Sequence, residues 1–142
     1  MLFQKHDSIL SVLILYINKS KMQEAITIKD KFDTESAQKI VDMGYPSNKK
    51  MLDDLIFWSC FPNDPVCHIT YPFLATLKDD DIALPIIEFL EFNIDSNQME
   101  LIENAFLILV KTRGENFIKL LHTKANSERI SELLDNLSKK YH

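Results

Sequence analysis

Glycine and cysteine, which many folds and sites require, are scarce in this sequence. Among 142 residues there are two glycines, Gly44 and Gly114. All-β proteins place glycine in many tight turns, and nucleotide-binding loops use it to surround phosphates, so the scarcity argues against both classes. The two cysteines, Cys60 and Cys67, are too few for a disulfide framework. We expect both to be free thiols packed in or near a core.

A long hydrophobic run is also missing. The longest strongly apolar run covers residues 9–17 and is interrupted by Ser11, whereas a helix that crosses a bilayer needs about 20 apolar residues. The run is followed by Lys19 and Lys21 and by no small-residue cleavage site, which argues against a secretory signal. The sequence therefore predicts a cytoplasmic protein that does not contact the membrane.

The overall composition is that of an ordinary globular protein. Hydrophobic residues make up 46% of the chain and charged residues 26%, a balance that supports a real core. The length predicts one domain over residues 1–142. The formal net charge is −5, and the lysines and arginines are scattered rather than clustered. Direct binding of nucleic acid, which depends on clustered basic residues, is not expected.

Apolar residues recur at three- and four-residue spacing along almost the whole chain. This periodicity predicts an all-α fold of about seven to nine helices. The expected helices cover residues 9–17, 23–31, 35–43, 47 or 48 to 61, 66–77, 82–92, 95–111, 115–122 and 127–141.

Several helix ends are marked by residue type. Thr34 is the expected N-cap of the helix over 35–43, and Gly44 followed by Pro46 is expected to end it. Asp95 with Gln98 three residues later has the form of a capping box, so we expect a long helix to begin there.

A weak repeat appears when segments about 31 residues apart are aligned. Residues 55–58 align with residues 86–89 and these with residues 117–120, which places Leu55, Ile86 and Phe117 at equivalent positions. The pattern predicts stacked antiparallel helical hairpins, in which each unit buries its apolar face against its neighbours. Over roughly residues 52–141 it resembles the HEAT and armadillo class of helical repeats. An irregular helical bundle with hairpins of similar length is the alternative.

The residue types that form metal sites are present, but their spacing does not fit. Cys60, Cys67 and His68 lack the short paired spacing of structural zinc sites. The three consecutive aspartates at 79–81 lack the alternating ligands and the glycine of calcium loops. We expect no metal and no cofactor.

Catalytic groups are equally hard to assemble. Ser59 and Cys60 lie in an expected helix with no glycine nearby, unlike the nucleophile of a strained turn. A hydrolase that uses Cys60 or Cys67 would need a thiol of depressed pKa beside a histidine. We therefore expect that the protein is not an enzyme.

The most distinctive feature is a one-sided charge distribution. Residues 79–110 contain eight carboxylates and no Lys, Arg or His. On a helix over 82–92, Ile86, Ile87, Phe89 and Leu90 would face inward and the acidic residues outward. The eight candidates for partner binding are Asp79, Asp80, Asp81, Glu88, Glu91, Asp95, Glu100 and Glu103.

Two interpretations of this acidic segment remain open. It can be a solvated face that keeps the protein soluble, with Asp80 or Asp81 also serving as the cap of the following helix. It can instead bind a basic protein, because complementary charge speeds association and fixes the register of a complex.

The profile of a small, acidic, all-helical chain without catalytic groups is similar to that of immunity proteins, which neutralise basic nuclease toxins in bacterial competition. That resemblance implies a basic toxin domain as partner and an acidic surface as interface. The alternative is an adaptor or regulator, such as a scaffold domain or a viral Bcl-2-like bundle, that receives a partner helix in an apolar groove.

Overall fold

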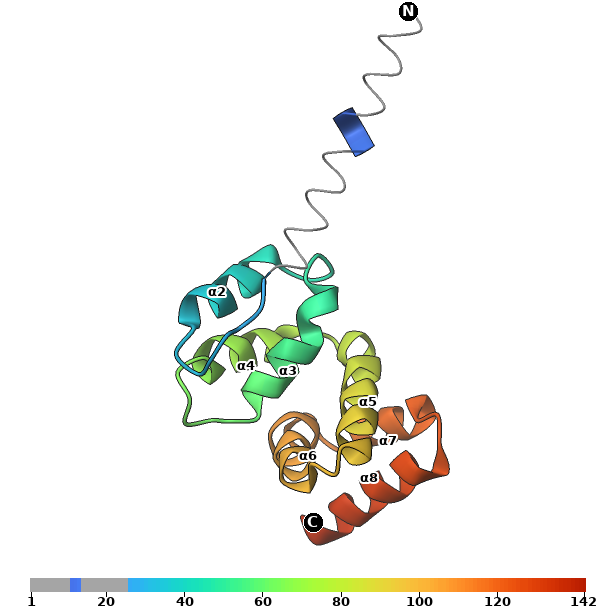
Figure 1. Ribbon diagram of the computed structural model, residues 1–142. Helices are drawn as coiled ribbons and strands as arrows, with labels where there is room; N and C mark the ends of the chain where they lie inside the picture. Colours follow the sequence, from blue (N-terminus) through green and yellow to red (C-terminus); the bar gives the residue numbers. More distant parts are fainter. Residues whose placement is uncertain (1–10, 14–25) are drawn as a thin grey trace, which may run out of the picture.

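The computed structural model describes residues 11–13 and 26–142, and this part of the chain is helical without a β-strand (Figure 1). The all-α prediction is thereby confirmed. Residues 11–13 are helical; the rest of the helix expected over 9–17 lies outside the described residues. The elements are α2 (Thr34–Met43), η1 (Lys49–Met51), α3 (Leu52–Ser59), α4 (Cys67–Thr76), α5 (Asp79–Asp95), α6 (Met99–Ala105), η2 (Phe106–Val110), η3 (Lys111–Arg113), α7 (Glu115–Lys124) and α8 (Glu128–Lys140).

The helices follow one another as three contacting pairs, α3 with α4, α5 with α6 and α7 with α8. Helix α2 packs on α4, and α5 contacts both α3 and α7, so it joins the two halves of the molecule (Figure 1). The repeated positions Leu55, Ile86 and Phe117 are all buried in this arrangement. The 31-residue spacing therefore corresponds to the first helix of each successive pair.

Helix α5 carries the central part of the core. Ile86, Ile87, Phe89 and Leu90 are buried, as the helical periodicity predicts. The side of α5 that carries these buried residues packs against α3, α6 and α7. The opposite side of α5 therefore faces outward. In the described part of the chain, no helix has the length and apolar character needed to span a membrane.

The N-terminal boundary of α2 differs from the prediction. Thr34 is the first helical residue, and Asp33 is the cap, with its Oδ1 accepting a hydrogen bond from the Ser36 amide at 3.2 Å. Asp33 Oδ2 also accepts from the Lys29 amide at 3.0 Å, and this bond is the main reason that the pKa of Asp33 is lowered. Gly44, with φ of 72°, ends α2 as predicted.

The short helix expected over residues 23–31 is not present in its described part. Residues 26–29 have no regular structure, while residues 23–25 lie outside the described residues. The amide of Ile28 donates to Asp54 Oδ2 at 3.0 Å, and that of Lys29 donates to Asp33. The backbone donors that a helix would use are thus bound by side chains elsewhere in the fold.

The capping-box pattern predicted that a helix begins at Asp95. This prediction is wrong, because Asp95 is the last residue of α5. The Asn97 amide donates to the Ile94 carbonyl and the Gln98 amide to the Asn93 carbonyl, while Asn97 has φ of 57°. This is the hydrogen-bond pattern of a Schellman motif with asparagine in the left-handed position. Buried contacts extend α5 past the local start signal, and the next helix, α6, begins at Met99.

The boundaries of the next helical segments also differ from the prediction. The helix expected from residue 47 or 48 to residue 61 begins with the 3₁₀ turn η1 and ends at Ser59. The helix expected over 95–111 is present as α6, which continues as the π-helical η2 and the 3₁₀ turn η3. Phe106, Leu109 and Val110 of η2 are buried. The final 3₁₀ turn places Arg113 beside α4 and α5.

Candidate functional site: an acidic groove between α3 and α5

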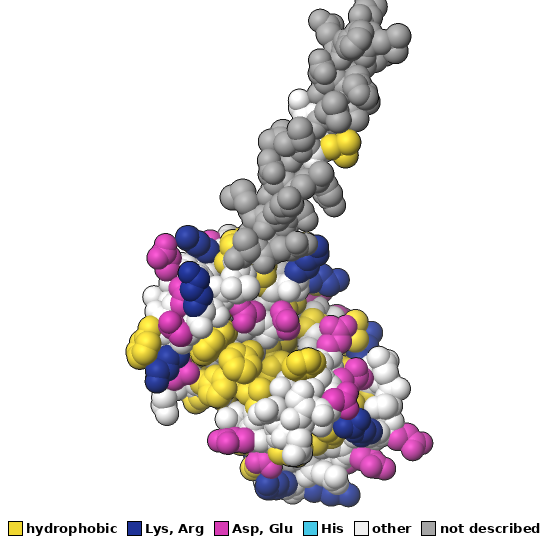
Figure 2. Space-filling model, in the orientation of Figure 1, with side chains coloured by type: hydrophobic (Ala, Val, Ile, Leu, Met, Phe, Trp, Pro, Cys, Tyr) yellow, Lys and Arg dark blue, Asp and Glu magenta, His cyan; other side chains and the backbone are white. Residues whose placement is uncertain are grey.

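A groove of about 790 Å³ lies between η1 and α3 on one side and α5 on the other. We call it the α3–α5 groove. Figure 2 shows this face of the molecule, with hydrophobic side chains gathered between α3 and α5 and carboxylates on both sides of them. It is lined by Tyr45, Lys49, Lys50, Leu52, Asp53, Asp54, Phe57, Asp80, Asp81, Leu84, Pro85, Glu88, Phe89, Phe92 and Asn93.

The apolar part of the groove includes two large side chains that α5 leaves uncovered. Leu84 is 44% exposed and Phe92 is 72% exposed. On α5 they alternate with acids, since Asp80, Leu84, Glu88 and Phe92 follow each other at four-residue spacing and thus share one stripe of the helix. Exposed apolar side chains that cluster in a groove with a polar rim are typical of an interaction site.

The carboxylates of the rim come from two helices far apart in sequence. Asp80, Asp81 and Glu88 are contributed by α5, and Asp53 and Asp54 by α3. Among the described residues, no Lys, Arg or His forms an ion pair with any of these five. Like charges on facing helices repel, and a cationic ligand would relieve that repulsion.

The aspartate triplet does not cap α5 in the way the sequence suggested. The N-cap is Lys78, whose side chain makes no capping bond, and Asp79 to Asp81 fill the first turn. Carboxylates at this position still stabilise the helix through its dipole. The first turn also places Asp80 and Asp81 on the rim of the groove.

Asp54 lies at the end of the groove where the chain before α2 passes. It is half-buried, and its Oδ2 accepts the Ile28 amide at 3.0 Å. Burial raises the pKa of Asp54 above its ordinary value, the charge of Asp53 adds to the rise, and the bond from Ile28 opposes it. Burial thus disfavours the charged form of Asp54, and a cation placed beside it would favour that form again.

Three of the eight predicted binding residues are engaged within the protein. Asp79 Oδ1 pairs with Arg113 Nη1 at 2.7 Å and Asp95 Oδ1 with Arg129 Nη1 at 2.6 Å. Glu103 accepts from Lys140 Nζ at 2.8 Å and from the Tyr141 hydroxyl at 2.9 Å. The cations come from residues 34 to 37 positions later in the chain. The lack of basic residues within 79–110 is thus partly balanced by tertiary contacts.

The other two predicted residues lie outside the groove lining. Glu91 is half-buried on α5, and Glu100 is exposed in the first turn of α6. Only three of the eight carboxylates therefore line the groove. Asp80, Asp81 and Glu88 are the members that the fold combines with an apolar surface.

We expect the variant Glu103→Gln to lower the melting temperature at pH 7 but not at low pH. Hydrogen bonds from Lys140 and Tyr141 lower the pKa of Glu103, so the folded state holds the charged form more strongly than the unfolded chain does. This stabilisation is complete above the unfolded pKa of about 4.3 and is lost as the pH falls through the lower folded pKa. Melting curves of both proteins from neutral to acid pH measure it.

The control for this prediction is Glu100→Gln, which changes an exposed carboxylate on the same helix that has no ion pair among the described residues. It should change the melting temperature little at any pH. A gap between Glu103→Gln and the unmodified protein that stays constant down to acid pH would contradict the linkage.

An aromatic cluster extends from the groove along α3. Phe57 lines the groove, and its ring meets those of Trp58 and Phe61 edge-on, at centroid distances of 5.1 and 5.3 Å. Trp58 is the only tryptophan in the sequence. Its fluorescence is therefore a local reporter of changes in the groove.

The cysteines are placed as buried thiols. Cys60 and Cys67 are free and buried, with Cys60 Sγ donating to the Ile56 carbonyl at 3.2 Å. Burial raises the pKa of Cys60 to about 12 and also raises that of Cys67, the opposite of the shift that a thiolate nucleophile needs. Among the described residues, no three His, Cys, Asp or Glu side chains gather in the manner of a metal site.

No protein-family model, curated protein or solved structure matches this chain.

Sequence reasoning left several groove residues out of the candidate set. Asp53 and Asp54 precede the acidic segment, and Leu84 lies among the apolar residues of a largely buried helix. Phe92 is one of four aromatic residues near the acidic segment, with Tyr71, Phe73 and Phe106, that the sequence offers as a possible interface centre but that are more typical of a core. A signal for Leu84 and Phe92 exists: both lie on the stripe of Glu88, opposite the inward-facing Ile86 and Leu90. Which helix faces this stripe cannot be read from local spacing, since α3 and α5 meet only through the tertiary fold.

Proposed function

We propose that this protein is a non-enzymatic binding protein that captures a basic protein partner in the α3–α5 groove. The observation that supports this most is the combination of five rim carboxylates with exposed Leu84 and Phe92 in one groove. Charge on the rim would speed and orient association, and the apolar floor would provide the buried contacts that hold the complex together.

The biological role that we propose is that of a cytoplasmic immunity protein, which neutralises a basic toxin of the nuclease type. The small size, the net charge of −5 and the helical fold support this role. A nuclease must present cations to the phosphate backbone, so an acidic protein can cover that surface. The alternative is an adaptor that receives a partner helix, which the apolar floor of the groove favours.

The test is neutralisation of the groove carboxylates in the triple variant Asp80→Asn, Asp81→Asn, Glu88→Gln. Partners captured from the source cells at low salt would be identified and produced as pure proteins, and their affinity would be measured by calorimetry. We expect the triple variant to bind at least about tenfold more weakly, and the affinity of the unmodified protein to fall as salt rises. Co-expression with the captured partner then tests whether the protein relieves toxicity.

A matched control removes three carboxylates outside the groove, in the triple variant Glu115→Gln, Glu128→Gln, Glu132→Gln. These residues are exposed on α7 and α8, and either triple raises the formal net charge of −5 by three. If both triples weaken binding equally, net charge alone acts and the groove is not the site. If neither weakens it, the acidic-capture proposal is wrong.

A further inference from the structure

We propose that the occupant of the α3–α5 groove is one amphipathic helix of the partner, with aliphatic or aromatic anchors on one face and Lys or Arg beside them. This inference rests on the proposed function and adds the shape of the ligand to its charge. The alternation of acids and apolar side chains along α5 is the feature that points to it.

The groove has the length of a short helix. Its stripe on α5 runs from Asp80 to Phe92, and twelve residues of helix at 1.5 Å per residue correspond to about 18 Å. A partner helix of about 12 to 14 residues, between three and four turns, would match this length. An extended strand has no equivalent support, because α3 and α5 are helices whose backbone groups are already bonded and the described residues contain no sheet edge.

The spacing of the groove residues sets the pattern of the ligand. Leu84 and Phe92 are eight residues apart, about 12 Å along the helix axis, so apolar anchors seven or eight residues apart on the partner can reach both. Phe57 faces them from α3 across the groove. Leu84 and Phe92 alternate with Asp80 and Glu88 on one stripe of α5, so the apolar anchors of the partner would contact α5 between its carboxylates.

The rim explains why the helix should be basic. Asp80, Asp81 and Glu88 line the groove from α5 and Asp53 and Asp54 line it from α3, so lysines or arginines on both flanks of an apolar face would meet carboxylates. Lys49 and Lys50 also line the groove, close in sequence to Asp53, so its lining is acidic in balance and not at every position.

The experiment uses the full chain and a synthetic amphipathic peptide of about 16 residues, with leucines at three- and four-residue spacing and lysine and arginine on both flanks. A second peptide has the same composition, with the leucines distributed around all sides of the helix. Binding is followed by Trp58 fluorescence and by amide chemical shifts. We expect the amphipathic peptide to bind at least about tenfold more tightly and to shift amides of residues 49–57 and 80–93.

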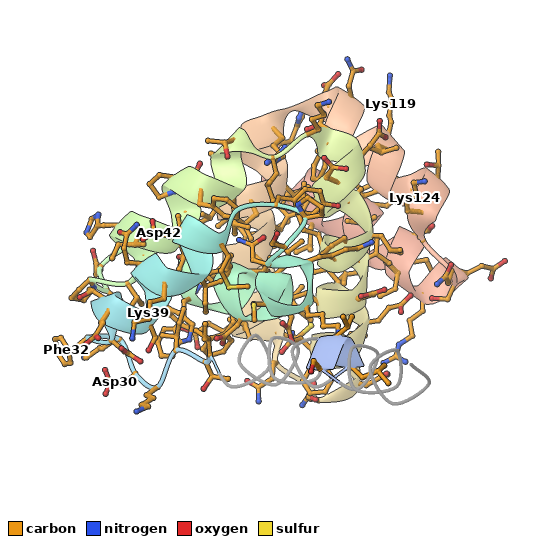
Figure 3. All side chains as sticks on the ribbon, turned by 90° about the horizontal axis from the view of Figure 1, so that it is seen from above. Asp30, Phe32, Lys39, Asp42, Lys119 and Lys124 are labelled. Atoms are coloured by element: carbon orange, nitrogen blue, oxygen red, sulfur yellow. The ribbon has the colours of Figure 1, made fainter. Side chains whose placement is uncertain are left out.

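The variant Phe92→Ser tests the apolar contact, and Phe32→Ser is its matched control. Both phenylalanines are exposed, 72% for Phe92 and 68% for Phe32, so neither change should unfold the protein. Phe32 lies at the outer edge of the molecule before α2, on the side opposite Lys119 and Lys124 (Figure 3). We expect Phe92→Ser to weaken peptide binding about tenfold or more and Phe32→Ser to leave it unchanged.

Three results would overturn the inference. They are equal affinity for the two peptides, absence of binding up to about 1 mM peptide, and equal affinity of Phe92→Ser and Phe32→Ser for the amphipathic peptide. If any of these occurs while the carboxylate triple still weakens capture of a basic partner, the helix is wrong and the proposed function stands. If the carboxylate triple has no effect either, both fail.

A third peptide with the sequence of residues 5–21 of this chain tests the main competing occupant. This segment contains the apolar run at 9–17 with Lys5, Lys19 and Lys21 around it, so its composition partly fits the groove. Tighter binding of this peptide than of the designed one would mean that the groove receives this chain, from the same or a second copy. In that case the proposal that the groove binds a helix of another protein is wrong.

Discussion

Replacement of Arg113 by alanine is expected to lower the free energy of unfolding by about 3 kcal/mol. Its Nη1 donates to the Leu77 carbonyl at 3.0 Å and to Asp79 Oδ1 at 2.7 Å, and its Nη2 donates to the Leu74 carbonyl at 2.6 Å. The side chain is only 15% exposed. Its removal would take this donor from the Leu77 carbonyl, leave the Leu74 carbonyl with the Leu77 amide alone at 3.1 Å, and leave Asp79 without its counter-ion where α5 begins.

The control for Arg113 is another arginine with a similar ion pair. Arg129 binds Asp95 at 2.6 Å, but its side chain is 57% exposed, so Arg129→Ala should cost less than about 1 kcal/mol. Arg113→Lys keeps the charge but cannot reproduce the fork that reaches three acceptors, and we expect an intermediate loss. Urea unfolding followed by circular dichroism and Trp58 fluorescence measures all three. Equal stability of the two alanine variants would show that burial does not set the difference.

The second large effect is expected for Phe117→Ala, with a loss of about 4 kcal/mol. Phe117 is fully buried on α7, which packs against α5, and alanine would leave a cavity between these helices. Phe32→Ala is the control, because Phe32 is 68% exposed and its removal should change stability by less than about 0.5 kcal/mol. Should the alanine variant not fold, Phe117→Leu gives a smaller step in the same direction.

Phe117 and Arg113 should also be energetically coupled. The Arg113 guanidinium lies over the Phe117 ring, 5.2 Å from its centroid. Because the ring both fills the core and supports the arginine, the double variant should lose less stability than the two single variants together, by about 1 kcal/mol. Strict additivity would mean that the ring only fills space.

In the acidic segment, residues 79–110, the fold pairs some carboxylates with cations and leaves others without an ion pair among the described residues. Asp79, Asp95 and Glu103 look alike in the sequence to Asp80 and Glu88, yet the first three have cationic partners from η3 and α8. Of the acids without an ion pair among the described residues, Asp80, Asp81 and Glu88 lie beside the apolar surface of the α3–α5 groove, whereas Glu91 and Glu100 do not line it. An experiment that neutralises all eight carboxylates would therefore mix loss of binding with loss of stability.

Helix ends were the least predictable feature, because several local signals compete for one boundary. Asp33 and Thr34 are both good capping residues, and the bond from the Ser36 amide to Asp33 Oδ1 shows that Asp33 caps α2, while a second bond from the Lys29 amide holds its other oxygen. At Asp95 the capping-box pattern was overridden, since the Asn97 turn lets α5 extend to the point where Arg129 can reach its last residue.

The sequence by itself determined the helical class, the buried face of α5 and the imbalance of charge in residues 79–110, because all three depend on spacing and composition within single segments. Only the tertiary structure decided which carboxylates are paired and which face a groove. Those outcomes depend on side chains 34 to 37 residues apart and on the meeting of α3 with α5, and local periodicity contains no information about either. The acidic groove is therefore a property of how the helices pack, although each of its side chains is visible in the sequence.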